Sequence, residues 1–153
     1  MLGFFYKISE SPVKTPLHLW IVGIVSLLWN VGGGYDYVMT QMKNQAYLGV
    51  MPQVQRDFLD SAPVWFDGLW AIGVWFSILG SVLLLARSRL ARTSFGLSFL
   101  GLLGAAIYRF GFAKPAMLQV TPPEMLAFSG AIAVVLIVLY IYAKAMTRAG
   151  VLR

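Results

Sequence analysis

The chain of 153 residues contains no cysteine and a single histidine, His18. Without cysteine it has no disulfide, no thiolate-bound metal and no cysteine nucleophile. One histidine is too few for the several imidazole ligands of a multi-histidine metal or haem site. The sequence therefore predicts no metal site, and we expect His18 to lie at a membrane interface, with a proton carrier or a single axial ligand as the lesser alternative.

Charged side chains are also scarce, at 12% of the residues, whereas 59% are hydrophobic. A soluble domain has roughly 25% charged and about 45–50% apolar residues. Two uncharged runs of 19 residues occupy positions 68–86 and 125–143. About 20 apolar residues cross a hydrocarbon core of roughly 30 Å, so the sequence predicts an integral membrane protein in a lipid bilayer. The formal net charge of +6 is then a topology signal, and no nucleic-acid partner is expected.

Hydropathy and helix-start signals predict an all-α, polytopic single membrane domain over residues 1–153, with four transmembrane helices in a compact bundle. The predicted spans are 16–38, 63–86, 93–112 and 122–146. The first is expected to begin with Thr15 as N-cap and Pro16 as the first helical residue. The last is expected to begin with a capping box between Thr121 and Glu124.

The basic and acidic residues separate across the predicted spans. Eight of the 12 basic residues fall on one side: Lys7, Lys14, Arg87, Arg89, Arg92, Lys144, Arg148 and Arg153. Five of the six acidic residues fall on the other: Asp36, Asp57, Asp60, Asp67 and Glu124. The positive-inside rule then places both termini in the cytoplasm (N-in/C-in) and the loops 39–62 and 113–121 outside.

The first of these loops contains a short amphipathic segment, PQVQRDFLD, at residues 52–60. Val54, Phe58 and Leu59 would lie on roughly one side of a helix there. We expect a short helix at the membrane surface, with a solvated turn as the alternative.

Small residues recur at helical spacing on all four predicted spans. They are Gly23, Asn30 and Gly34 on the first; Gly73, Ser77, Gly80 and Ser81 on the second; Ser94, Ser98, Gly101 and Ala105 on the third; and Ala127, Ser129, Gly130 and Ala131 on the fourth. Because helices in lipid associate by close packing of small residues, these positions predict a tight bundle. A substrate path lined by small residues is the alternative.

Four charges lie near the outer ends of the spans, one on each helix. We expect Arg109 to lie among the carboxylates and to pair most closely with Asp36, since an unpaired charge in hydrocarbon is costly. Asn30, deeper in the first span, is expected to hydrogen-bond to a neighbouring helix. The predicted polar cluster, which either binds a ligand or is structural, comprises Asn30, Tyr35, Asp36, Tyr37, Asp67, Tyr108, Arg109 and Glu124. The alternative is a set of interfacial charges reaching headgroup water, with the tyrosines in an aromatic belt.

Three tryptophans lie at membrane depth: Trp29, Trp70 and Trp75. Contact with lipid or with the protein core is the more common role for such residues. The sequence predicts no resident cofactor, but a bound lipid, quinone or pigment against one of these rings stays open.

The run TPLHLWIVGIVSLLWNVGGGYDYVMTQMKNQAYL resembles the N-terminal half of a group of small bacterial four-helix inner-membrane proteins. The matching positions are Trp29-Asn30, Gly33, Asp36-Tyr37, Met39-Thr40, Tyr47, Pro63, Trp65, Trp70-Ala71 and Gly73-Val74-Trp75. These proteins are often labelled "sugar transporter" but have no assigned mechanism. The resemblance implies the four-helix architecture and a bacterial inner membrane. The sequence departs from the group at Gly32–Gly34, where it has more glycine than those proteins.

Composition and motifs leave three classes of function. We expect an accessory or scaffold subunit packed against a larger membrane complex. The alternative is a small-solute, possibly sugar, transporter or channel acting as an oligomer, because four helices leave little room for a central path. An enzyme is not expected, since no convergent acid–base pair is visible. The expected partners are other membrane subunits or further copies of the chain.

Overall fold

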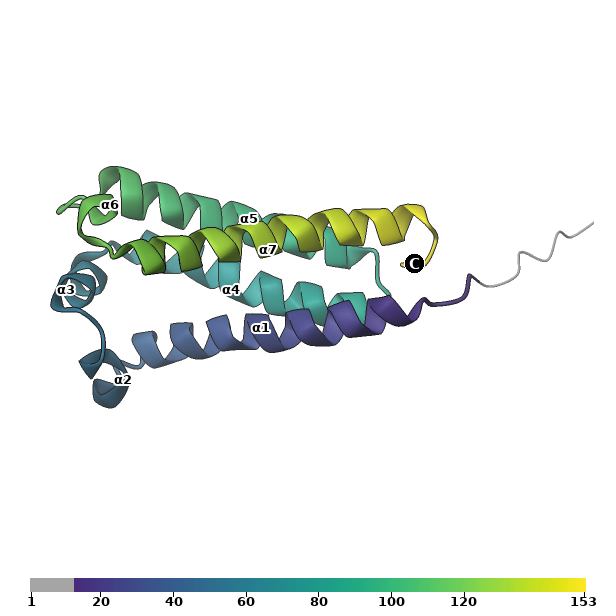
Figure 1. Cartoon of the computed structure of the whole chain (residues 1–153), viewed down its shortest axis with the longest axis horizontal. Coiled ribbons are helices and arrows are strands. Elements are labelled where there is room, and N and C mark those ends of the chain that lie inside the picture. The colour runs from purple at the N-terminus through teal and green to yellow at the C-terminus, as the bar shows by residue number, and fades with distance from the viewer. Residues whose placement is uncertain (1–12) are drawn as a thin grey trace, which may run out of the picture.

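The computed structural model describes residues 13–153 as an all-helical bundle (Figure 1). The four long helices are α1 (Leu17–Gln41), α4 (Val64–Leu85), α5 (Leu90–Ile107) and α7 (Pro123–Arg148). A π-helical turn, η1 (Tyr108–Phe112), extends α5, and the short helices are α2 (Gln45–Gly49), α3 (Gln53–Ser61) and α6 (Met117–Val120). Four helical segments of the described chain are long and apolar enough to cross a membrane. The predicted four-helix membrane fold is therefore confirmed.

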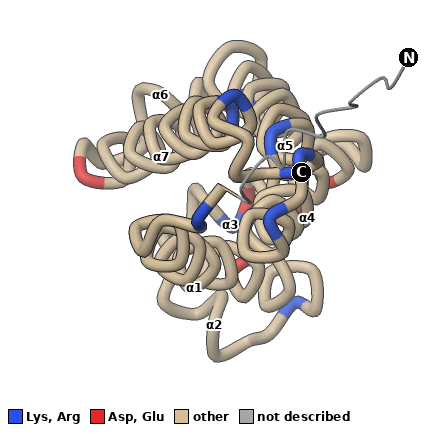
Figure 2. Tube along the Cα trace, turned by 90° about the vertical axis from the view of Figure 1, so that its right-hand side faces the viewer, with Lys and Arg blue, Asp and Glu red and all other residues tan. Residues whose placement is uncertain are grey.

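The long helices lie side by side along one axis, and the segments that connect them lie at the two ends of the bundle (Figure 1). The short helices α2, α3 and α6 gather at one end, which we call the α3 end. The α4–α5 link (residues 86–89) and the C-terminal residues lie at the opposite end, which we call the link end. By their places in the sequence, the five described acidic residues belong to the α3 end, whereas seven of the eleven described basic residues belong to the link end. Figure 2 views the bundle from the link end, with lysine and arginine positions in blue. Lys7 lies outside the described residues.

Both predicted side-chain caps are wrong. The N-cap residues of α1 and α7 are Pro16 and Pro122, in extended conformation, and neither helix has a side-chain capping hydrogen bond. Each helix thus starts one residue later than the predicted cap required. Thr15 and Thr121 consequently precede the N-cap and are misplaced to accept from the first free N–H groups, and no capping box with Glu124 forms.

The closest helix contact joins α4 and α5. A Cβ on Gly101 would lie 2.7 Å from both the amide nitrogen of Gly73 and the carbonyl oxygen of Leu69, so the two backbones touch. Two buried serines of α5 reinforce the contact: the Ser98 hydroxyl donates to the Gly73 carbonyl, and Ser94 donates to Phe76 across 2.8 Å. Small residues therefore create this interface by allowing close approach, as predicted.

Helix α1 packs against the other side of α4 through its own small residues. Gly23 and Gly34 are buried, and a Cβ on either would clash with the side chains of Leu85 and Ile78 respectively. Helix α4 is thereby enclosed between α1 and α5, while α7 packs chiefly against α5. The core at the link end includes Leu19, Leu84, Phe95, Leu136 and Leu139.

The C-terminal residues close the link end. Val151 is 4% exposed and Leu152 is fully buried in the core. The Arg153 N–H donates to the Arg87 carbonyl at 2.8 Å, and the Arg89 N–H donates back to the Arg153 carbonyl at 3.1 Å. These two backbone bonds attach the segment after α7 to the link between α4 and α5.

The small residues predicted to form a contact on the fourth span do not pack against another helix of residues 13–153. Ala127, Gly130 and Ala131 are exposed, and a Cβ on Gly130 would meet nothing within 4 Å. The residues of α7 that are buried, Leu136, Leu139 and Ala143, all lie in its half nearer the link end. Since only that half is anchored in the core, the half nearer the α3 end presents its small residues outward.

We expect Gly101→Ala to destabilise the bundle because the added methyl would meet backbone atoms that cannot move independently of α4. Overpacking of this kind costs about 1–3 kcal/mol. The melting temperature of the purified protein in detergent measures the effect. Gly32→Ala is the matched control: its Cβ has nothing within 4 Å, so helix propensity should leave stability unchanged or raise it by up to about 1 kcal/mol. Equal melting temperatures for the Gly101→Ala protein and the wild type would contradict the backbone contact.

Candidate functional site

Asn30 bridges α1 and α4 within the membrane-spanning part of the bundle. Its side chain is 7% exposed, and its Nδ2 donates to the Ser77 carbonyl at 3.1 Å and to Ser81 Oγ at 2.9 Å. The predicted interhelical hydrogen bond is confirmed. Bonds of this type in membranes contribute about 0.6–2 kcal/mol each. Asn30 therefore helps hold α1 on α4 and lies apart from the charges of the α3 end.

Asp36 pairs with a tyrosine of α2. The Tyr47 hydroxyl donates to Asp36 Oδ1 at 2.7 Å, and the rings of Tyr35 and Tyr47 meet edge-to-face with their centroids 5.7 Å apart. Helix α2 brings Tyr47 there because Asn44 is its N-cap and accepts from the Tyr47 N–H at 3.0 Å. Burial and the hydrogen bond to Asp36 raise the pKa of Tyr47 to about 12.

The predicted ion pair between Asp36 and Arg109 does not form, although Asp36 is the carboxylate whose charge acts on Arg109. The Arg109 guanidinium lies over the rings of Phe58 and Phe110, at 5.4 and 5.6 Å from their centroids. Its Nε is buried and has no hydrogen-bond partner in the described part of the chain. The physical reason is a pair of competing contacts: α2 brings the hydroxyl of Tyr47 to Asp36, and α3 brings the ring of Phe58 to Arg109.

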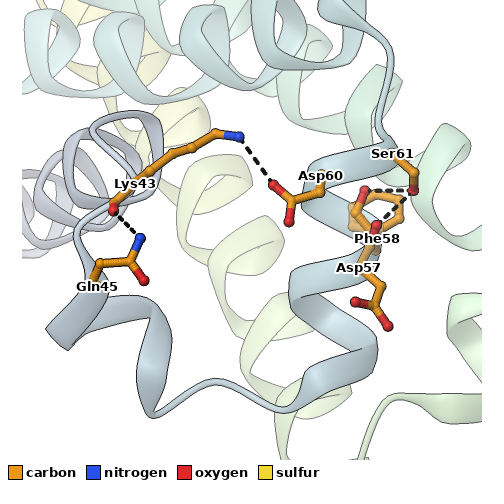
Figure 3. A network of polar contacts seen from close by, with 6 residues as sticks. All are labelled: Lys43, Gln45, Asp57, Phe58, Asp60 and Ser61. Atoms are coloured by element: carbon orange, nitrogen blue, oxygen red, sulfur yellow. Dashed lines mark hydrogen bonds and ion pairs between the residues drawn. The ribbon is translucent and has the colours of Figure 1, made fainter.

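The only ion pair among residues 13–153 joins Lys43 and Asp60 at 3.2 Å, between the segment after α1 and helix α3 (Figure 3). The two side chains are 73% and 69% exposed, so the pair contributes little to stability. The Ser61 hydroxyl donates to the carbonyls of Asp57 and Phe58 and closes the end of α3 (Figure 3).

Tyr37 and Tyr108 pack within the protein. The Tyr37 ring meets the rings of Trp70 and Trp75 edge-to-face, and its centroid lies 5.1 Å and 6.2 Å from theirs. Tyr108, in η1, meets Trp65 at 4.8 Å and joins the aromatic cluster under α3. That cluster contains Phe58, Phe66, Trp70, Tyr108 and Phe110. Trp70 and Trp75 thus have a protein neighbour on at least one face.

Asp67 and Glu124 lie in the first turns of α4 and α7. A carboxylate there interacts favourably with the helix dipole. Neither side chain makes an ion pair or a side-chain hydrogen bond with another described residue. The eight residues of the predicted cluster therefore form no common hydrogen-bonded or ion-paired group. Asn30 lies in the α1–α4 interface, Tyr35 and Asp36 contact Tyr47, and Tyr37 contacts two tryptophans. Tyr108 and Arg109 lie in the aromatic cluster, and Asp67 and Glu124 lie at the starts of their helices.

Sequence reasoning missed Tyr47 and Phe58 as the partners of the two charges. A signal for Tyr47 was present, because Asn44 is a favoured N-cap residue and places Tyr47 three residues into a helix that turns back toward Asp36. Phe58 was assigned to the apolar side of the short helix, but its contact with Arg109 depends on how α3 folds over η1, which no local pattern encodes.

Trp29 borders an apolar groove between α1 and α7. The groove encloses about 290 Å³ and is lined by Ile21, Val22, Val25, Ser26, Trp29, Val135 and Leu139. The Trp29 ring also approaches Phe128 of α7, with centroids 5.9 Å apart. A bound lipid, quinone or pigment at Trp29 stays a hypothesis, and this groove is where it would lie.

No protein-family model, curated protein or solved structure matches this chain. The resemblance to small four-helix proteins of bacterial inner membranes stays a prediction.

The raised pKa of Tyr47 predicts a loss of stability at alkaline pH. Because the folded state holds Tyr47 protonated, its contribution is fully present below the ordinary tyrosine pKa of about 10. It is lost as the pH rises through the folded pKa of about 12. The melting temperature of the wild type should exceed that of Tyr47→Phe at pH 8, and the difference should shrink between pH 10 and 12.

Tyrosinate absorbance provides the control for this titration. Subtracting the Tyr47→Phe spectrum from that of the wild type isolates the ionisation of Tyr47. In the Asp36→Asn protein, the ionisation of Tyr47 is isolated by subtracting the spectrum of Asp36→Asn/Tyr47→Phe. It should occur at lower pH, because the carboxylate that holds the phenol protonated is gone. An unchanged titration in Asp36→Asn would contradict the role of this hydrogen bond.

Proposed function

We propose that the chain is a non-catalytic accessory or scaffold subunit of a larger assembly in the bacterial inner membrane. In this proposal the half of α7 nearer the α3 end packs against a transmembrane helix of the partner. The interface is the α7 docking face, defined as Ala127, Phe128, Gly130, Ala131 and Val134, which are all exposed.

The observation that carries the proposal is the contrast between α7 and the other spans. At the α4–α5 contact, small residues lie against another helix and the backbones touch. The α7 docking face has the same small-residue spacing, with Ala127 and Ala131 four residues apart. No described helix packs on these small residues, and only the edge of the face, at Phe128, meets Trp29 of α1. In an apolar 18-residue stretch of α7 only 11% of the residues are buried, whereas 28–33% are buried in the corresponding stretches of the other three spans. Small residues at this spacing favour close helix–helix packing in lipid.

The packing of the bundle favours a scaffold over a solute path through a single chain. The α4–α5 interface is closed by contact between Gly73 and Gly101. On the opposite face of α4, where it meets α1, the polar groups of Asn30, Ser77 and Ser81 hydrogen-bond to one another. A solute would have to displace these contacts in order to pass between the helices.

Charge distribution supports the orientation within this proposal. The described basic residues of the link end are Lys14, Arg87, Arg89, Arg92, Lys144, Arg148 and Arg153. An excess of lysine and arginine favours the cytoplasmic side. The link end and both termini then face the cytoplasm, and α2, α3 and α6 face outward.

Co-purification in mild detergent followed by mass spectrometry tests the docking face. We expect the tagged wild-type chain to retain a stoichiometric larger membrane protein. Gly130→Leu should reduce the retained partner by tenfold or more, because the leucine would hold the partner helix away. Gly33→Leu is the matched control: it makes the same change at an exposed helical glycine with nothing within 4 Å, and it should retain the partner.

The outcome also separates the two classes of function. A wild-type chain that purifies without a larger partner would contradict the subunit proposal. If it purifies as a homo-oligomer that Gly130→Leu dissociates, the docking face joins copies of the chain, and solute uptake by liposomes containing the oligomer would then support the transporter alternative.

Since the chain lacks cysteine, single-cysteine variants report the proposed orientation without background. Gly49→Cys lies in the exposed α2 segment, and Ala149→Cys lies at the exposed end of α7. A membrane-impermeant maleimide should label Gly49→Cys in cells whose outer membrane has been made permeable. It should label Ala149→Cys only after the inner membrane is opened. The reverse pattern would invert the topology.

A further inference from the structure

A second apolar groove runs between α5 and α7 and opens at the link end. It encloses about 1050 Å³. Its walls are Leu97 and Leu100 from α5 and Ile137 and Ile141 from α7, all four of them at least 40% exposed. Tyr140 packs on Gly96 along the groove, where a Cβ would lie 3.5 Å from the ring.

The mouth of the groove carries two arginines. Arg89 and Arg92 line it where α5 begins, and both side chains are exposed. The Arg92 guanidinium lies 5.9 Å from the centroid of the Tyr140 ring, which holds the positive charge beside the groove. The acidic residues of the described chain belong to the α3 end, and none forms an ion pair with either arginine. Among residues 13–153, therefore, no acidic side chain neutralises the two arginines at the mouth.

The length of the groove matches one bilayer leaflet. From Arg89 to Leu100 the rise along α5 is about 16 Å, and from Thr147 to Ile137 along α7 it is about 15 Å, at 1.5 Å per residue. Half of a hydrocarbon core of roughly 30 Å is about 15 Å. The arginines thus lie at headgroup level when the apolar walls lie along the acyl chains of the same leaflet.

We propose that this groove binds an anionic glycerophospholipid of the leaflet at the link end. The phosphate and the anionic headgroup lie against Arg89 and Arg92, since guanidinium groups form charge-assisted hydrogen bonds with phosphate oxygens. The acyl chains follow the apolar walls formed by Leu97, Leu100 and Ile137. This ligand class goes beyond the subunit function and does not depend on it, because the α7 docking face belongs to the other half of the helix.

Charge complementarity favours a lipid over a transmembrane helix as the occupant. The groove is apolar along its length and positive at one end only, which is the charge pattern that complements a lipid with an anionic headgroup. A neutral transmembrane helix would leave the two arginines without an anion at the mouth. Basic residues immediately beside a membrane-spanning helix attract anionic headgroups, and such attraction weakens as salt rises.

The test uses the full chain in a neutral detergent with added phosphatidylglycerol or phosphatidylcholine of the same acyl composition. We expect phosphatidylglycerol to raise the melting temperature more than phosphatidylcholine. Native mass spectrometry should show at least fivefold more of it retained. The preference should disappear in Arg89→Gln/Arg92→Gln. Arg148→Gln is the control, because it removes a basic charge at the same end of the bundle but outside the groove, and it should keep the preference.

A second variant tests the apolar walls with the charges intact. Leu100 is 61% exposed and lines the groove, so we expect the fold to tolerate Leu100→Trp and the larger ring to fill part of the groove. The retention of phosphatidylglycerol should then fall at least threefold. Equal retention of the two lipids by the wild type would overturn the proposal. So would a preference that survives Arg89→Gln/Arg92→Gln or is unaffected by Leu100→Trp, because the anion would then bind elsewhere on the basic rim.

Discussion

Contact between the backbones of α4 and α5 at Gly73 and Gly101 is the constraint on which the rest of the bundle depends. Lipid offers little hydrophobic drive for helix association, so close approach and interhelical hydrogen bonds must supply the attraction. Here both act at one crossing, because the glycines allow the approach that lets Ser98 reach the Gly73 carbonyl. A side chain at either glycine would separate the helices and stretch that bond.

The other two long helices each pack against one member of this pair. Helix α1 joins the free side of α4 through Asn30, and α7 joins α5 through the half that enters the core at the link end. This order leaves α7 at the edge of the bundle, with one half anchored and the other half open. Both proposals come from that asymmetry: the open half supplies the α7 docking face, and the anchored half forms one wall of the groove whose mouth carries Arg89 and Arg92.

Features encoded by spacing along one helix were predictable from the sequence, whereas contacts between distant segments were not. Hydropathy identified the fold, and the positions of Gly73, Gly101 and Asn30 indicated helix contacts that the structure contains. The pairing of Asp36 with Arg109 failed because their true neighbours come from α2 and α3, whose paths depend on tertiary packing. The small residues on α7 lie at the predicted positions, but no helix of the described residues packs against them.

The attachment of residues 151–153 to the α4–α5 link bears on how the protein is made. These residues follow all four spans in the sequence, and they complete the core at the link end by burying Val151 and Leu152. During synthesis the α4–α5 hairpin can enter the bilayer and form its glycine contact long before they leave the ribosome. The core at the link end can therefore be completed only after translation has passed the fourth span, because residues 151–153 must reach back to the link between the second and third spans.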